Sequence, residues 1–220
     1  MPGSTVTLYG AHYSVYTRIV RLALGEKGVA YDFEPIDIFA KEGPPDDYLV
    51  RHPFARIPAF EHDGFKLYEA GAITRYIDEA FAGPALQPGS PQPRARMSQI
   101  MSILDSYGFR SLVWDVFFER VRSPQVGRVC DEAKIGAGLE MSGSCLSAIS
   151  EIRGEGSWLV GDDVSLADLY AYPMITLFRL APEGLSLLEE YPALVDWYGR
   201  FGERASAGAT RHPLEPDESS

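Results

Sequence analysis

The segment from Gly83 to Pro93 places the strongest constraint on the fold. It contains four prolines and two glycines, which exclude a continuous helix or strand. Strand-like and helical patterns alternate before this segment, and helical patterns alone follow it. We therefore expect two domains, at 1–82 and 94–205, joined by a linker at 83–93, and a disordered polar tail at 206–220.

The first domain is expected to be a mixed α/β fold. Its pattern predicts, in order, strand 5–9, helix 15–24, strand 30–36, one or two helical turns at 46–51, strands 57–61 and 65–68, and helix 72–81. The strand–helix–strand start requires a parallel pair of strands. The tripeptide His62-Asp63-Gly64 predicts a hairpin between the last two strands. This order is that of a thioredoxin-like domain.

The second domain is expected to be entirely helical. Apolar residues at helical spacing predict long helices around 100–118 and 139–152 and a last helix around 194–201. The sequence from Ser165 to Asp168 predicts the start of a further helix, because these two side chains can cap each other's backbone N–H groups.

Composition narrows the classes of function. The chain has 220 residues and a formal net charge of −11, which argues against a nucleic-acid-binding surface. No apolar run approaches the ~20 residues needed to cross a bilayer, and the first residues lack the pattern of a secretory leader. The two cysteines form no Cys-x-x-Cys motif, and the four histidines show no metal-ligand spacing. We expect a cytoplasmic protein without a metal, a membrane or a nucleic-acid partner.

Four motifs carry a resemblance to a known family. The serine-bearing segment Tyr13 to Val20 lies where the first helix should begin, and the segment His52 to Phe60 contains Ile-Pro. The segments Leu67 to Ile73 and Ser165 to Asp168 follow in order. Together these motifs resemble those of cytosolic glutathione S-transferases, of a bacterial type with a serine, as in the phi, zeta and theta classes. The resemblance implies a thioredoxin-like domain followed by a helical domain.

That resemblance implies a detoxifying homodimer with glutathione as co-substrate and a small hydrophobic electrophile as the second substrate. A free thiol has a pKa near ~8.5, so only about 3% is ionised at pH 7. A hydrogen bond to the thiolate supplies ~1.5–3 kcal/mol, and a helix N-terminus adds about 0.3–1 kcal/mol. Ser14 lies where both effects meet, with Arg18 one turn later, so we expect both in catalysis. Ser14 could instead serve only as a helix cap, and Tyr9 is the competing hydroxyl.

The resemblance also implies a set of glutathione-binding residues. Glu69 would hold the γ-glutamyl ammonium, and the Ala70 N–H would bind its carboxylate at a helix N-terminus. We expect the Ile57–Pro58 bond to be cis, so that the Ile57 backbone would hold the cysteinyl part. Arg56 and Pro58 are further glutathione-binding candidates. The chain departs from the family at Ala70, where a serine is usual, and at Gly43-Pro44-Pro45, near the usual polar contacts to the glycyl arm.

The electrophile pocket is expected to involve Tyr13, Tyr107 and Trp114. Phe54 is a candidate for an aromatic side chain that inserts into a partner subunit. Two alternatives remain open on the same scaffold. One is a glutathione-dependent isomerase or dehalogenase, and the other is a non-catalytic binding module.

Overall fold

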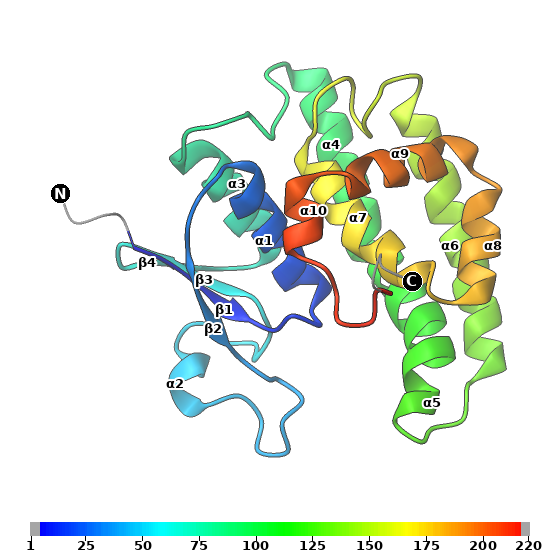
Figure 1. The fold of residues 1–220 in the computed structure, drawn as a ribbon, viewed down its shortest axis with the longest axis horizontal. Helices are drawn as coiled ribbons and strands as arrows, with labels where there is room; N and C mark the ends of the chain where they lie inside the picture. The colour runs from blue at the N-terminus through cyan, green and yellow to red at the C-terminus, as the bar shows by residue number, and fades with distance from the viewer. Residues whose placement is uncertain (1–4, 217–220) are drawn as a thin grey trace. The chain divides into compact units, whose positions relative to one another are not determined.

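The computed structural model describes residues 5–216, and these form two compact units (Figure 1). The first unit contains the residues up to 85 together with 205–214. The second contains 86–204 and the residues from 215. The first is a mixed α/β unit and the second is helical, as predicted.

The sheet of the first unit has four strands in the order β2-β1-β3-β4. Their bounds are β1 (Val6–Gly10), β2 (Asp32–Pro35), β3 (Ala59–His62) and β4 (Phe65–Tyr68). Strands β1 and β2 run parallel, while β3 is antiparallel to both β1 and β4. The predicted parallel pair and closing hairpin are therefore both present.

The turn of the hairpin follows from Asp63 and Gly64. Their φ angles are +48° and +85°. Two successive residues with positive φ are what a two-residue hairpin turn of type I′ requires, and Asp-Gly is a favoured pair for it. The sequence therefore encodes this turn locally.

Helices cover both faces of this sheet: α1 (Val15–Glu26), α2 (Asp46–Leu49) and α3 (Ala70–Ala80). Leu8 is paired with Phe60, whose ring contacts Tyr76 of α3, so α3 lies on the face of these buried residues. Tyr9 points to the other face and contacts Tyr48 of α2. Figure 1 shows α1 and α3 side by side.

The approach of α1 to the end of β1 depends on Gly10. A Cβ at this position would lie 2.5 Å from Thr17 Oγ1, which is closer than any real contact. Thr17 is fully buried, so its side chain has little room to move. A glycine is therefore needed where β1 leads into the turn before α1.

The second unit is built on helices of varied length. Their bounds are α4 (Pro91–Ile103), η1 (Leu104–Arg122), α5 (Ser123–Gln125), α6 (Glu132–Arg153), α7 (Leu166–Phe178), α8 (Pro182–Glu189) and α9 (Pro192–Gly202). The predicted helices around 100–118, 139–152 and 194–201 correspond to α4 with η1, α6 and α9. The helix continues from α4 into η1, which is wound as a π-helix.

A buried carboxylate organises this unit. Asp168 is fully buried and accepts hydrogen bonds from Ser165 Oγ at 2.8 Å and from Trp197 Nε1 at 2.7 Å. The backbone N–H groups of Ser165 and Leu159 also donate to it, at 2.8 and 2.9 Å. The predicted capping box at the start of α7 is confirmed, and it also joins α7 to α9.

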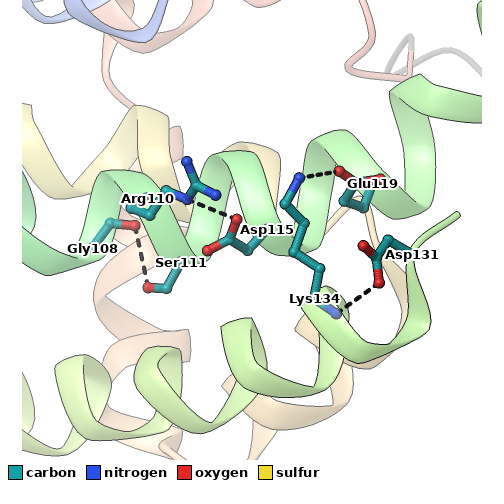
Figure 2. A network of polar contacts seen from close by, with 7 residues as sticks. All are labelled: Gly108, Arg110, Ser111, Asp115, Glu119, Asp131 and Lys134. Carbon is teal, nitrogen blue, oxygen red and sulfur yellow. Dashed lines mark hydrogen bonds and ion pairs between the residues drawn. The ribbon is translucent and has the colours of Figure 1, made fainter.

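A second buried carboxylate joins η1 to α6 (Figure 2). Glu119 is 2% exposed and accepts a hydrogen bond from Lys134 Nζ at 2.6 Å. This hydrogen bond lowers the pKa of the Glu119 carboxyl below its ordinary value, against the opposing effect of burial. Asp131 caps α6 by accepting from the Lys134 backbone N–H at 3.1 Å. One lysine therefore links the cap of α6 to the side of η1.

The segment after α9 differs from the expectation of a disordered tail. Residues 205–209 form α10 (Ala205–Ala209), which packs on α1 within the first unit. Arg21 Nη2 donates to the Ala209 carbonyl at 3.0 Å, and Ser206 Oγ donates to Glu26 at 2.5 Å. These tertiary contacts order the segment. It is short and its side chains are small, so its sequence alone does not predict a helix. The end of the predicted tail, 217–220, lies outside the described residues.

Candidate glutathione site

The register of the sheet gathers the predicted site segments at one end. Tyr9 of β1 is paired with Ala59, and Ala59 is paired with Tyr68 of β4. The last residues of β1 and β4 therefore lie beside the first residue of β3. The residues just beyond, including Pro58 and Glu69, lie at that same end of the sheet.

Ser14 is the N-cap of α1 at this end. It has extended backbone geometry, and its Oγ accepts a hydrogen bond from the Thr17 backbone N–H at 3.2 Å. In the part of the chain that the structure describes, no acceptor takes the Ser14 hydroxyl proton. The side chain is half-buried, so this proton is available to a ligand at the helix N-terminus. The cap role and the predicted thiol-binding role are compatible, because they use different parts of the hydroxyl.

Tyr13 is the neighbouring hydroxyl, and it is already engaged. It donates to Asp37 Oδ1 at 2.9 Å, and its ring lies 5.7 Å from that of Phe39. Burial and this hydrogen bond to a carboxylate raise the pKa of Tyr13 to about 12. Tyr13 is therefore a neutral donor committed to Asp37. Its ring packs against the apolar cluster that includes Ala11 and Ile57.

Tyr9 lies on the sheet face below α2. The guanidinium of Arg51 stacks on its ring at 4.3 Å and also pairs with Glu61. Burial raises the pKa of the Tyr9 hydroxyl, and the nearby Arg51 only partly opposes this. These contacts favour a packing role for Tyr9 over thiol activation.

The Ile57–Pro58 bond is cis, as predicted. Ile57 is buried with Ala11 and Tyr48 in one apolar cluster, so the segment before β3 packs against the turn that leads to Ser14. The Tyr48 hydroxyl donates to the Arg56 carbonyl at 2.7 Å and fixes the entry to the cis bond. The Arg56 side chain itself is exposed.

Glu69 is the N-cap of α3 and adopts φ +69° and ψ +114°. Such a conformation is uncommon for a residue with a side chain and costs on the order of 1–3 kcal/mol. The strained backbone turns β4 directly into α3. Glu69 is exposed, and the Ala70 that follows it is buried. An exposed carboxylate therefore stands beside the N–H groups that open α3.

Arg18, Arg21 and Arg56 lie in different environments. Arg18 is 2% exposed, and its backbone N–H donates to the Ser14 carbonyl at 2.9 Å. Its part in catalysis stays a prediction. Arg21 hydrogen bonds to Tyr31 and to α10. Arg21 is partly exposed and Arg56 is exposed.

The second unit carries the other two predicted pocket residues. Tyr107 of η1 is 54% exposed. Trp114 is half-buried, and its ring lies tilted against that of Phe118 at 4.9 Å between ring centroids. Their part in an electrophile pocket stays a prediction.

Two residues of the site were missed by sequence reasoning. Asp37 holds Tyr13, and His212 contacts the carbonyl of the same tyrosine. Neither belongs to a motif, and His212 lies 199 residues from its partner in the chain. Nothing in the sequence brings such a pair together.

The described residues contain no group of three His, Cys, Asp or Glu side chains placed to hold a metal ion. Within residues 5–216, no helix combines the length and apolar character needed to span a bilayer.

Comparisons with known proteins agree with this arrangement. Residues 8–85 match the family model for the glutathione S-transferase N-terminal domain, and residues 136–200 match that for its C-terminal domain. Glutathione S-transferase F6 of Arabidopsis thaliana is 27% identical over 202 residues, which cover 92% of this chain and 97% of the relative.

Solved structures show the same fold. Glutathione transferase F7 from Populus trichocarpa aligns with a TM-score of 0.84 at 28% identity, covering 94% of this chain and 97% of that one. Glutathione S-transferase I from maize, in complex with an atrazine–glutathione conjugate, aligns with a TM-score of 0.82 at 26% identity, covering 94% and 96%. Both family domains are thus present in order, on the expected fold. The chain therefore belongs to the glutathione S-transferase superfamily, as an enzyme with both of the family's domains.

Proposed function

We propose that this chain is a serine-type glutathione transferase, in which Ser14 activates the glutathione thiol for attack on a small hydrophobic electrophile. One observation carries the proposal. The Ser14 hydroxyl caps α1 through its oxygen and keeps its proton for a ligand, at the sheet end that Pro58 and Glu69 share. The related maize enzyme was solved with a glutathione conjugate, which supports glutathione as the substrate.

The chemistry follows from the position of the hydroxyl. A proton directed at sulfur stabilises the thiolate more than the thiol, so it lowers the thiol pKa. The positive end of the α1 dipole acts in the same direction. The ionised sulfur attacks the electrophile and forms a C–S bond, while the thiol proton leaves to solvent. In a substitution the leaving group departs with its bonding electron pair; in an addition the π electron pair of the electrophile takes up a proton from solvent. Accepting the Thr17 N–H orients the serine before glutathione arrives.

The remaining predicted residues would hold the rest of glutathione. Glu69 would pair with the γ-glutamyl ammonium, and the Ala70 N–H would bind its carboxylate. The backbone of Ile57, next to the cis bond, would receive the cysteinyl part. Tyr13 would form an apolar wall beside the sulfur, with Tyr107 and Trp114 as further candidates.

Further parts of the proposal concern assembly and location. We place the protein in the cytoplasm as a homodimer that uses neither metal nor nucleic acid. Isomerase or dehalogenase chemistry on the same thiolate remains the enzymatic alternative. A non-catalytic module is supported by Ala70, which lacks the usual serine hydroxyl, and by Gly43-Pro44-Pro45.

The test is the ionisation of bound glutathione, measured by thiolate absorbance against pH. Ser14→Ala should move the titration midpoint toward the free value and lower turnover at neutral pH about 10- to 150-fold, which corresponds to ~1.5–3 kcal/mol. Ser14→Thr keeps both the cap and the proton, so it should retain most of the activity. An unchanged midpoint in Ser14→Ala would contradict the proposal. Binding without turnover in the unmodified protein would favour the non-catalytic module.

A further inference from the structure

The C-terminal segment 205–214 belongs to the first unit, and its helix α10 is held on α1. Arg21 donates to the Ala209 carbonyl, and Thr210 Oγ1 donates to the Ser206 carbonyl at 2.8 Å. A Cβ on Gly25 of α1 would lie 3.1 Å from Ser206 Cβ, which shows how closely the two helices approach. The segment that follows α10 therefore starts from a fixed position.

His212 lies in this segment and is 7% exposed. The Leu214 backbone N–H donates to His212 Nδ1 at 3.1 Å, and His212 Nε2 lies 3.2 Å from the Tyr13 carbonyl oxygen. A carbonyl only accepts, so Nε2 must carry a proton, whereas Nδ1 accepts and carries none. Nε2 is therefore the donor in the bond to the Tyr13 carbonyl.

The Tyr13 carbonyl belongs to the peptide group whose nitrogen is that of Ser14. This N–H donates to the Ala11 carbonyl at 3.0 Å. His212 and Ala11 therefore hold the two ends of one peptide plane. Rotation of that plane would change φ of Ser14 and swing its Oγ away from the Thr17 N–H.

We propose that His212 is a positioning residue for thiol activation, which fixes the peptide plane before Ser14 through the Tyr13 carbonyl. This inference rests on the proposed role of Ser14. His212 does not contact the sulfur in this scheme. It sets the direction from which the serine proton is presented, so the far C-terminal segment forms part of the glutathione-activating machinery.

The expected effect is an intermediate loss of thiol activation. His212→Ala should lower turnover at neutral pH about three- to tenfold and raise the thiolate midpoint by about 0.5 to 1 pH unit, since one neutral hydrogen bond is lost. The loss should shrink at high pH, where glutathione ionises unaided. His212→Gln can still donate to the Tyr13 carbonyl, so it should recover part of the shift. In Ser14→Ala, adding His212→Ala should change the midpoint no further.

A matched control separates positioning from simple docking of α10. Ser206→Ala removes the bond to Glu26 but keeps the Cβ that packs on α1, so it should lower stability without moving the midpoint. Hydrogen exchange of the Ser14 and Thr17 amides should accelerate in His212→Ala and remain unchanged in Ser206→Ala. This second measurement does not require any turnover.

The outcomes are distinct. Faster exchange together with a raised midpoint supports the inference. Faster exchange while Ser14→Ala leaves the midpoint in place would contradict the proposed function, and with it any catalytic role of His212. A normal midpoint in His212→Ala, when Ser14→Ala moves it, would overturn the inference alone. Equal shifts of the thiolate midpoint in His212→Ala and Ser206→Ala would also overturn the inference.

Discussion

The Tyr13 hydroxyl donates to Asp37 Oδ1 at 2.9 Å, while the adjacent Ser14 hydroxyl accepts from the Thr17 N–H. Two neighbouring hydroxyls thus have opposite roles in their hydrogen bonds. The tyrosine proton is already bound to a carboxylate, and the serine proton is not bound in this way. This difference favours Ser14 over Tyr13 as the proposed thiol partner.

The first prediction concerns Tyr13. Tyr13→Phe removes the bond to Asp37 but keeps the ring, so the thiolate midpoint of bound glutathione should not move. Asp37 still accepts from the Phe39 N–H at 2.9 Å, so the local loop should persist. Tyr9→Phe should behave in the same way, because its ring stacks under Arg51. A raised midpoint in either variant, measured by thiolate absorbance, would make a tyrosine the activating group.

The second prediction concerns glutathione binding by Glu69. Replacing it by alanine should weaken binding about 10- to 150-fold, because a charge-assisted hydrogen bond to the ammonium is lost. Glu69→Gln retains the shape of the side chain but loses its charge. Its affinity for glutathione should therefore lie between those of Glu69→Ala and the unmodified protein. Glu79→Gln removes a charge from the other end of α3 and serves as the control. Calorimetry measures all three, and equal affinities for Glu69→Ala and the unmodified protein would refute the assignment.

The third prediction concerns assembly through Phe54, which is 66% exposed beside Pro53. We expect a homodimer, so light scattering should report about twice 24.3 kDa. Phe54→Ser should weaken the dimer, because an apolar anchor is lost. Phe39 is 62% exposed, and Phe39→Ser should leave assembly unchanged. A monomer at micromolar concentration in the unmodified protein would rule out the dimer.

The fourth prediction concerns acid stability. A carboxyl whose pKa is lower in the folded state stabilises the fold above its unfolded pKa of ~4.3, and this contribution is lost as pH falls through the folded pKa. Glu119 is such a group because of Lys134. Glu119→Gln should therefore lower the free energy of unfolding by about 1–3 kcal/mol at pH 7, and the difference should shrink below about pH 4.

Its control is Glu132→Gln, which breaks an exposed pair with Arg120 at 2.7 Å. Surface ion pairs contribute little to stability, so the free energy of unfolding of this variant should be close to that of the unmodified protein. Denaturant titrations at pH 7 and pH 3.5 compare the variants. An equal deficit for Glu119→Gln at both pH values would show that the ion pair is not its source.

Sequence patterns predicted those parts of the fold that depend on neighbours in the chain. Asp63-Gly64 specifies its own turn, and Ser165 with Asp168 specifies its own cap, since all the interacting groups lie within a few residues. The cis bond before Pro58 was predicted through the family resemblance rather than from local preference.

The remaining features depend on partners far apart in the chain. Asp168 also accepts from Trp197, which no capping motif indicates. The π-helical winding of η1 could not be predicted, because its apolar pattern is compatible with both an α-helix and a π-helix. For α10, the small polar residues after 205 indicated disorder, because the contacts to Arg21 and Glu26 that order them are tertiary.

Two pieces of the chain, 5–85 and 205–214, form the first unit, and residues 86–204 of the second unit lie between them in the sequence. A ribosome delivers residues 205–214, the last piece of the first unit, only after residues 86–204 of the helical unit have been synthesised. A nascent chain that stops before residue 205 therefore lacks α10 and the ring that holds the Tyr13 carbonyl. The first unit therefore cannot be completed before residue 214 has been synthesised.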